Sequence, residues 1–392
     1  MSVDSTAARS AQAGPSVVVG MVGAGQLARM TAQAAVGLGI GFRVLADSPQ
    51  DSAAQVCAGA EIGDYRSAAD VLAFAANCDV VTFDHEHVPG EHLTALEQVS
   101  AVRPDRQALL YAQDKKAMRE RLSDLGVSCP RYRPVTSVAD VVAFVADNGG
   151  AWPVMLKATS GGYDGKGVWS CAGPDQAAVV LGHGISLIAE EQVGFDRELA
   201  VLVARSPKGQ GAAYPVVQTI QRDGICREVI APAPGLDPNL AVAAQRLGLM
   251  IAAELGVTGL LAVELFAVGS ELIVNELAMR PHNCGHWTID AAATSQFEQH
   301  LRAILDLPLG TPLLAYPSAV MVNVLGGDDP DLYSRLVHVM AADPGVKVHL
   351  YGKPVRPGRK VGHVTVAGDD VAQLRDRAWR AANYLSLGTE TP

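Results

Sequence analysis

The sequence predicts a multidomain protein that opens with a doubly wound α/β domain and continues as α+β. Its 392 residues, 49% of them hydrophobic, exceed the roughly 250–300 residues that a single core organises. An apolar run at residues 17–22, a glycine turn, an Ala/Leu-rich stretch and a second apolar run at residues 42–47 form a βαβ pattern. From Val154 onward, short strands separated by glycine turns replace this alternation.

The first predicted domain covers residues 16–115. Residues 80–83 supply a further strand, which ends at the charged run Asp84-His85-Glu86-His87. A charged helix over residues 114–125 then leads through a glycine into the next domain. Residues 1–15 have neither the basic start nor the apolar stretch of a signal peptide, and we interpret them as a disordered tail.

The central predicted domain covers residues 116–314, and a small terminal domain covers residues 315–392. Pro238 suits the first turn of a helix that continues with helical spacing over residues 240–255 until Gly256 ends it. Another helix begins at Ser295, where Glu298 three residues later completes a capping box. The apolar run at residues 320–324 then begins the terminal domain.

Composition and charge exclude several classes of partner. A net charge of −10 leaves little basic surface for displacing counterions, so we expect no nucleic-acid or anionic-membrane partner. No apolar run approaches the roughly 18–20 residues of a membrane span. The six cysteines show no CxxC pair and no compact secreted frame, which suits reduced thiols in a cytoplasmic protein.

The first candidate site is the turn Gly23-Ala-Gly25-Gln-Leu-Ala28. It fits G-x-G-x-x-A after a strand, and Asp47 follows about 20 residues later, where a dinucleotide site places its ribose-binding acid. The same glycines suit any tight strand-to-helix turn that packs closely or holds an anion at a helix N-terminus. The turn alone therefore leaves a cofactor site and a packing role open.

Residues 154–169 predict a flap over phosphates. One strand delivers Lys157, a loop with glycines at positions 161, 162, 165 and 167 carries Lys166, and another short strand closes the hairpin. Glycines let the backbone approach phosphate closely, and the lysines add positive charge. The stretch is not a Walker P-loop, because Gly167 stands where that pattern requires Ser or Thr. A flexible surface hairpin is the alternative interpretation.

Residues 261–277 predict a β-hairpin with its turn at residues 268–270. Pairing the strands about Ser270 sets Glu264 opposite or nearly opposite Glu276, and Asn275 adds a third polar group among apolar neighbours. Facing carboxylates repel each other. A divalent cation removes that cost, since Mg²⁺ takes one or two carboxylates together with substrate phosphate oxygens. A solvated hairpin face with two ordinary glutamates is the alternative.

Two polar segments follow this hairpin. The loop at residues 278–287 contains a His-x-Cys-x-His sequence, whose spacing fits no usual zinc pattern. We therefore expect the loop to offer Arg280, His282 and Asn283 to an anion rather than to bind a metal. Prolines shape a second, basic segment, for which a phosphomonoester site and a merely solvated turn both remain open. Its cations are Lys353, Arg356, Arg359 and Lys360.

Taken together, these segments resemble one family, the ATP-dependent N5-carboxyaminoimidazole ribonucleotide synthetases. The resemblance rests on the stretches GQLARM, GGYDGKG, RPHNCGHWTID, SQFEQHLRA and RPGRKVGH, which begin at residues 25, 161, 280, 295 and 356. They stand in the family's order and span nearly the whole chain from residue 17. No single stretch decides the family, whereas the ordered set is specific.

The resemblance implies an ATP-grasp fold, with a Rossmann-like pre-ATP-grasp domain at residues 16–115, an ATP-grasp domain at residues 116–314 and a C-terminal domain at residues 315–392. It implies an ATP-grasp ligase that uses ATP, Mg²⁺ and bicarbonate to carboxylate the exocyclic amine of aminoimidazole ribonucleotide. The products would be ADP, phosphate and the carboxyamino nucleotide of de novo purine biosynthesis, formed through carboxyphosphate. We also expect a homodimer and a functional hand-off of the product to a mutase.

The resemblance also implies roles for individual residues. ATP is expected to contact Lys115, Lys157, Gly161, Gly162, Tyr163, Asp164, Gly165, Lys166, Gly167, the adenine hinge Glu190, Glu191, Gln192 and Val193, the ribose-binding Glu198, and Gln221, Asn275 and Glu276. Mg²⁺ is expected on Glu264 and Glu276. The groups expected around bicarbonate and the reacting amine are Tyr163, Asp164, Arg280, His282 and Asn283. The ribonucleotide is expected to contact Gln26, Leu27, Glu86, Lys353, Arg359 and Lys360.

Two positions depart from the family's pattern. Met279 stands where a proline usually precedes the arginine, and Cys284 stands where serine is common. Neither change removes a charged group, so we expect altered loop packing rather than lost activity. A biotin carboxylase or a ribonucleotide transformylase would share most of this chemistry. The rival from another class is an NAD-dependent dehydrogenase built on the glycine turn.

Overall fold

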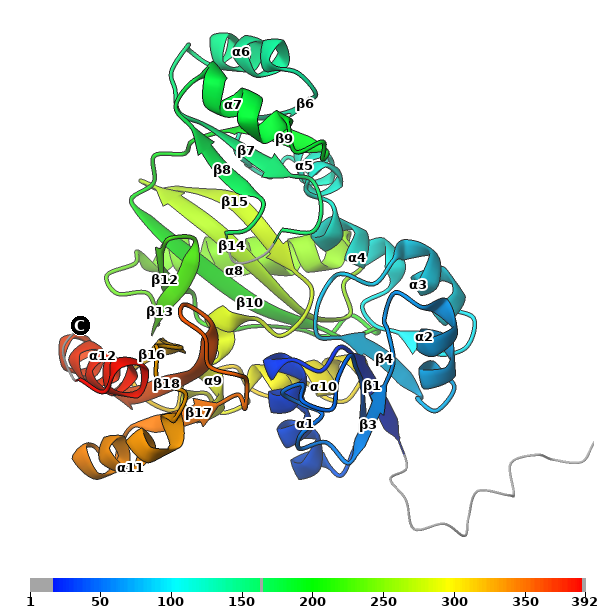
Figure 1. Cartoon of the computed structure of the whole chain (residues 1–392), viewed down its shortest axis with the longest axis vertical. Coiled ribbons are helices and arrows are strands. Elements are labelled where there is room, and N and C mark those ends of the chain that lie inside the picture. Colours follow the sequence, from blue (N-terminus) through cyan, green and yellow to red (C-terminus); the bar gives the residue numbers. More distant parts are fainter. Residues whose placement is uncertain (1–16, 163–164, 390–392) are drawn as a thin grey trace, which may run out of the picture.

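The computed structural model describes residues 17–162 and 165–389, and that part of the chain contains three β-sheets (Figure 1). The expected disordered tail and the flap residues Tyr163 and Asp164 lie outside the described residues. No described helix is long and apolar enough to cross a membrane. The predicted combination of an α/β opening with an α+β remainder is confirmed.

The N-terminal sheet is parallel and doubly wound, with strand order β3-β2-β1-β4-β5. Its strands are β1 (Val18–Val22), β2 (Gly41–Ala46), β3 (Gly59–Ile62), β4 (Val80–Phe83) and β5 (Ala101–Val102). Its helices are α1 (Gln26–Leu38), α2 (Ala68–Ala75), α3 (Gly90–Leu96) and α4 (Arg106–Gln113). Ligands bind at the carboxyl ends of such strands, and the ends of β1 and β4 carry the glycine turn and the charged run.

A small antiparallel sheet of order β6-β9-β7-β8 lies at the top of Figure 1, with two helices packed on it. Its strands are β6 (Tyr132–Val135), β7 (Val154–Ala158), β8 (Val168–Cys171) and β9 (Leu187–Glu191), and the helices are α6 (Val138–Asp147) and α7 (Pro174–Leu181). The buried faces of these elements form a separate apolar core. The strands β7 and β8 are the two arms of the predicted flap hairpin.

A nine-stranded sheet forms the centre of the molecule, with order β15-β14-β10-β12-β13-β16-β18-β17 and β11 paired to β10. Its strands are β10 (Arg197–Arg205), β11 (Gly211–Ala213), β12 (Val217–Arg222), β13 (Ile225–Ala231), β14 (Gly259–Val268), β15 (Glu271–Ala278), β16 (Ser318–Leu325), β17 (Lys347–Leu350) and β18 (Lys360–Gly368). The pairing of β13 with β16 carries the sheet across the predicted boundary at residue 314. The domain boundaries therefore stay predictions.

The remaining helices follow the N-terminal sheet or lie between and after the strands of the central sheet. They are α5 (Lys115–Asp124), α8 (Pro238–Glu254), the short η2 (Asn283–Gly285), α9 (Thr288–Ala291), α10 (Gln296–Ile304), α11 (Leu332–Ala342) and α12 (Val371–Leu387). Pro238 occupies the first turn of α8, as predicted, and Asp237 caps that helix. Ser295 caps α10, but the Glu298 carboxylate pairs with Arg302 at 2.6 Å instead of closing a capping box.

Candidate active site

A cavity of about 560 Å³ is lined by residues of the two antiparallel sheets and by helices and a loop of the N-terminal domain, and this volume is typical of a small-molecule site. Lys166, Gly167, Lys353 and Arg359 do not line it, and Tyr163 and Asp164 lie outside the described residues. The predicted site residues that do line it are Gln26, Leu27, Glu86, Lys115, Lys157, Gly161, Gly162, Gly165, Glu190, Glu191, Gln192, Val193, Glu198, Gln221, Glu264, Asn275, Glu276, Arg280, His282, Asn283 and Lys360.

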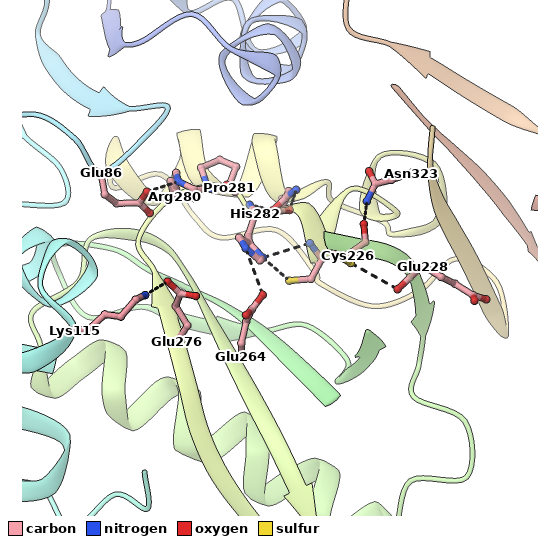
Figure 2. A network of polar contacts seen from close by, with 12 residues as sticks. Glu86, Lys115, Cys226, Glu228, Glu264, Glu276, Arg280, Pro281, His282 and Asn323 are labelled. Carbon is pink, nitrogen blue, oxygen red and sulfur yellow. Dashed lines mark hydrogen bonds and ion pairs between the residues drawn. The ribbon is translucent and has the colours of Figure 1, made fainter. Parts of the chain in front are cut away.

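Two carboxylates face the cavity from one hairpin (Figure 2). Glu264 on β14 pairs in register with Glu276 on β15, as the turn position predicted. Burial raises the pKa of Glu264 to about 8, and the adjacent Glu276 adds to that rise. Burial acts the same way on Glu276, but Lys115 Nζ, 2.6 Å from Oε1, outweighs it and lowers the pKa of Glu276. The hairpin thus concentrates negative charge where a cation would relieve repulsion.

Two mostly buried lysines lie beside these carboxylates. Lys115 begins α5, and Lys157 on β7 lies 2.6 Å from Glu190 and 3.2 Å from the Asn275 side-chain oxygen. Burial lowers the pKa of Lys157, and the charge of Glu190 opposes that shift. The two lysine side chains are 12–13% exposed, so their charge is directed into the cavity with little screening by solvent.

The expected adenine hinge, residues 190–193, lines the cavity, but the Glu190 side chain forms ion pairs within the protein. Its carboxylate is 1% exposed and contacts Arg119 Nε at 2.8 Å and Lys157 Nζ at 2.6 Å. Glu191 pairs with Arg131 at 2.6 Å. Since the Glu190 carboxylate is occupied by two cations, adenine contacts at this position would have to come from the backbone.

Glu198 and Gln221 lie on the neighbouring strands β10 and β12 and both line the cavity. Burial raises the pKa of Glu198, and a backbone hydrogen bond from Gln221 opposes this rise. A register shift in β12 falls just before Gln221 and re-aims the chain there. A half-buried carboxylate with a nearby amide suits recognition of a ribose hydroxyl.

The flap hairpin closes over one side of the cavity. Its base is fixed by hydrogen bonds from the Ala158 N–H to the Gly167 carbonyl at 2.8 Å and from the Lys115 N–H to the Thr159 carbonyl at 2.8 Å. Gly165 lies against the turn between β12 and β13, where a Cβ would come within 3.0 Å of the Gly224 Cα. Lys166 is exposed on the loop.

The loop after β15 brings Arg280, His282 and Asn283 to the cavity wall (Figure 2). Arg280 Nε donates to Glu86 at 2.8 Å, which joins two groups expected to bind the same substrates. Burial and then the charges of Arg280 and Lys360 lower the pKa of His282 to about 3, so its ring is neutral. Both polar atoms of the Asn283 amide are buried without a hydrogen-bond partner in the described part of the chain.

The glycine turn before α1 holds a carboxylate of the protein itself. Asp84, at the end of β4, accepts hydrogen bonds from the Gly25 N–H at 2.7 Å and the Ala28 N–H at 2.8 Å. A Cβ on Gly25 would lie 2.4 Å from an Asp84 oxygen. The position that a dinucleotide pyrophosphate occupies in a Rossmann site is therefore filled. Gln26 and Leu27, next in the chain, line the cavity.

The basic turn contributes unequally to the site. Lys360 lines the cavity, and Lys353 bonds the side chain of Gln26 in the cavity wall. Arg359 is exposed, and its guanidinium donates to the Pro354 carbonyl at 3.4 Å. The structure therefore brings two of the three expected phosphate-binding cations to the cavity or its edge.

Several groups of the site were missed from the sequence. Arg119 is fully buried on α5 and donates to Glu190 and to the carbonyls of Val274 and Asn275. No local sequence pattern predicts this role. Phe195 and Phe266 stack in the cavity wall with ring centroids 4.6 Å apart. Phe266 follows Glu264 by two residues in one strand, so the period-two pattern could have placed it on the same face.

Three family comparisons cover most of the chain. Residues 17–113 match the ribonucleotide synthetase preATP-grasp domain, residues 120–297 match the ATP-grasp domain, and residues 319–377 match the phosphoribosylaminoimidazole carboxylase C-terminal domain. The chain is 54% identical to the N5-carboxyaminoimidazole ribonucleotide synthase of Mycobacterium tuberculosis over 95% of this chain and 89% of the relative. It is 49% identical to that of Corynebacterium ammoniagenes, over 94% and 92%.

Solved structures agree with these relatives. N5-carboxyaminoimidazole ribonucleotide synthetase from Thermus thermophilus superposes with a TM-score of 0.85 at 37% identity, over 94% of this chain and 98% of that one. The enzyme from Aspergillus clavatus, in complex with ADP and 5-aminoimidazole ribonucleotide, gives 0.87 at 31% identity, over 95% and 99%. The chain therefore belongs to the N5-carboxyaminoimidazole ribonucleotide synthase family of ATP-grasp ligases.

Proposed function

We propose that the chain carboxylates the exocyclic amine of 5-aminoimidazole ribonucleotide with ATP and bicarbonate, giving N5-carboxyaminoimidazole ribonucleotide, ADP and phosphate in purine biosynthesis. The observation that carries this proposal is a single cavity whose wall holds both the carboxylate–lysine cluster and the loop at Arg280. The Aspergillus clavatus relative, described with ADP and aminoimidazole ribonucleotide, supports the same pair of ligands.

The carboxylate pair fits a nucleotide-bound Mg²⁺ ion. Among the described residues, no group of three or more His, Cys, Asp or Glu side chains could hold a metal ion. Mg²⁺ needs no such group, since it commonly takes one or two carboxylates and completes its shell with phosphate oxygens and water. Glu264 and Glu276 would hold it, and when bound it supplies positive charge at the transferring phosphate.

In the first step, a bicarbonate oxygen attacks the γ-phosphorus of ATP and the bond to the ADP oxygen breaks. Carboxyphosphate and ADP result, and charge builds on the γ-phosphate oxygens. Lys115 and Lys157, held in place by Glu276 and Glu190, lie where they can stabilise that charge. Arg280, anchored by Glu86, can orient the bicarbonate.

In the second step, carboxyphosphate breaks down to CO₂ and phosphate, and the amine of the ribonucleotide captures the CO₂. The departing phosphate can take the amine proton, so no protein side chain needs to accept it. The neutral His282 is consistent with a step that needs no protein acid, because its lowered pKa suits a hydrogen-bonding group rather than a general acid at neutral pH. The Asn283 amide, which has no hydrogen-bond partner among the described residues, offers a donor and an acceptor to the same ligands.

Closure of the flap excludes water from the reactive intermediate. Carboxyphosphate that meets water wastes ATP, so a closed site favours productive transfer. Lys360 in the cavity wall and Lys353 beside Gln26 are suited to the substrate phosphate, and Arg359 lies nearby on the exposed turn. The homodimer, the hand-off to a mutase and the cytoplasmic location stay predictions.

Phosphate release from ATP tests the proposal. We expect release to require both bicarbonate and aminoimidazole ribonucleotide and to be matched by formation of the carboxyamino product. Phosphate release with formate in place of bicarbonate would indicate a transformylase. Phosphate release with biotin in place of the ribonucleotide would indicate a biotin carboxylase. A rate of phosphate release that is the same with and without the ribonucleotide would overturn the assignment.

A further inference from the structure

A buried glutamine clamps the cavity loop by its backbone. Gln296, the first residue of α10, is fully buried. Its Oε1 accepts the His282 N–H at 2.8 Å, and its Nε2 donates to the His282 carbonyl at 2.8 Å. Both backbone polar groups of one residue are therefore satisfied by one side chain, which fixes the orientation of the two peptide units flanking His282.

The start of α10 also holds the rest of the loop. Gln296 Nε2 lies 3.1 Å from His286 Nδ1, and the Gln296 N–H donates to the Thr288 hydroxyl at 2.9 Å. That hydroxyl donates in turn to the Gly285 carbonyl at 2.6 Å. Since Oε1 accepts from His282, Nε2 is the donor side of the amide, and His286 Nδ1 must be an acceptor. The clamp thus has a defined polarity.

The clamp acts on the cavity through His282 and not by touching it, since Gln296 does not line the cavity. The His282 ring accepts from the Cys284 N–H with Nδ1 at 3.4 Å and lies with Nε2 3.7 Å from Glu264. Two residues earlier, Arg280 is held by Glu86. A rotation of the His282 peptide would therefore re-aim the ring toward or away from the carboxylate pair and disturb its neighbours.

One turn later, the same helix carries a matching clamp on a different loop. Gln299 is also fully buried, and its Oε1 accepts the Gly310 N–H at 2.8 Å while its Nε2 donates to the Gly310 carbonyl at 2.7 Å. Gly310 does not line the cavity. The chain therefore offers two glutamines that each bind both backbone groups of one residue, one under the active-site loop and one remote from it. Gln296 differs in its further contact with His286.

We infer that Gln296 is a positioning residue of this enzyme, which sets His282 and, through it, the bicarbonate and ribonucleotide end of the cavity. This inference rests on the proposed function. The nucleotide is held chiefly by other elements, namely Lys115 on α5 and Lys157 on β7. Gln296 reaches it only through the 3.7 Å approach of His282 to Glu264, so its effect should be much larger on the other two substrates than on ATP.

The test compares Gln296→Met with Gln299→Met, because methionine keeps the length of glutamine and removes both hydrogen bonds. Each variant leaves a buried N–H and a buried carbonyl unpaired, and Gln296→Met also removes the contact with His286 Nδ1, so both should lose stability and Gln296→Met at least as much as Gln299→Met. We expect Gln296→Met to lower kcat and raise the KM values for bicarbonate and ribonucleotide, roughly 10-fold to 100-fold together, because small misplacements of reacting groups carry such penalties. The KM for ATP should stay within about twofold, and Gln299→Met should keep all four constants near wild type.

Gln296→Glu supplies a second variant if methionine prevents folding. A protonated carboxyl can still accept from the His282 N–H and donate to its carbonyl, whereas the ionised form turns an oxygen toward that carbonyl. Burial favours the protonated form, so kcat relative to wild type should fall as pH rises through the pKa of the introduced carboxyl. This side chain contacts His282 and His286. The other titratable and charged groups, which lie around those two histidines, are His349, His363, Tyr351, Glu264, Arg280 and Lys360.

Equal kinetic behaviour of the Gln296 and Gln299 variants would overturn the inference, as would an effect confined to the KM for ATP or a flat relative pH profile for Gln296→Glu. Failure of the proposed function looks different, because the wild-type enzyme itself would then release no phosphate in response to the ribonucleotide.

Discussion

Replacing Glu190 by glutamine should destabilise the protein and weaken its hold on the triphosphate without changing which base it accepts. The Glu190 carboxylate contacts Arg119 at 2.8 Å and Lys157 at 2.6 Å, and Arg119 is fully buried. Glutamine keeps the shape of the side chain but leaves both cations without that carboxylate. Lys157 would then be free to leave the phosphate-binding position.

The magnitude follows from the burial of the partners. Removing one member of a buried ion pair costs about 3–5 kcal/mol. Arg119 keeps its hydrogen bonds to the carbonyls of Val274 at 3.2 Å and Asn275 at 2.7 Å, so we expect the lower end, about 3 kcal/mol. Burial raises the pKa of Glu190, but Arg119 and Lys157 outweigh it and lower the pKa. The stabilisation is therefore fully present above the unfolded pKa and is lost as pH falls through the folded pKa.

Denaturant unfolding at neutral and acidic pH measures this loss, and initial rates with ATP and GTP measure base preference. Glu191→Gln is the matched control, because its partner Arg131 is 59% exposed and such pairs contribute about 0–1 kcal/mol. Equal stability of the two variants, together with a gain in GTP use by Glu190→Gln, would refute the reasoning and assign the carboxylate to adenine recognition.

Three further perturbations bear on the site. Glu276→Gln should lower kcat by about 10²-fold or more while the fold persists, and near-normal activity at low Mg²⁺ would remove the hairpin from the metal site. Lys353→Ala should raise the KM for the ribonucleotide about tenfold to a hundredfold, and Arg359→Ala should raise it less because its side chain is exposed. An effect on the KM for ATP alone would show that the basic turn binds ATP instead. The Mg²⁺ concentration giving half-maximal rate should fall as pH rises through about 8, because Glu264 must lose its proton to bind a cation, and a pH-independent Mg²⁺ requirement would contradict this. Without metal, the stability that protonated Glu264 contributes should be fully present below the ordinary carboxyl pKa of 4.5 and lost by the time pH passes about 8.

Local patterns predicted the parts of the site that lie close together in the sequence. The hairpin turn at residues 268–270 brings Glu264 close to Glu276, because strand register follows from the turn. The turn alone would pair Glu264 with Asn275, and a register shift next to Glu264 sets it opposite Glu276. The flap was recognisable for the same reason, since its glycines and lysines lie within one hairpin. The resemblance then added distant residues such as Glu198, which no spacing within the chain could have linked to the hairpin.

Contacts across long stretches of chain were not predictable in this way. Asp84 reaches the glycine turn from 59 residues away, and the turn looked like a dinucleotide site because its own sequence does not show that a carboxylate fills it. Arg119 reaches Asn275 from 156 residues away, and one arginine on a charged helix looks like a solvated side chain until tertiary packing buries it. Glu190 was correctly placed at the cavity, yet its ion pair gave it a task other than the expected one.

The continuity of the central sheet has a mechanical consequence. The strands that carry the two acidic residues and the strand that begins at Lys360 are bonded into one hydrogen-bonded framework through β10, β12, β13 and β16. The spacing between the acidic pair and Lys360 is thus set by one continuous sheet. The strands that carry the flap and Lys157 belong to a separate sheet with its own apolar core, so a change in the orientation of that sheet would move Lys157 without altering the spacing of Glu264, Glu276 and Lys360.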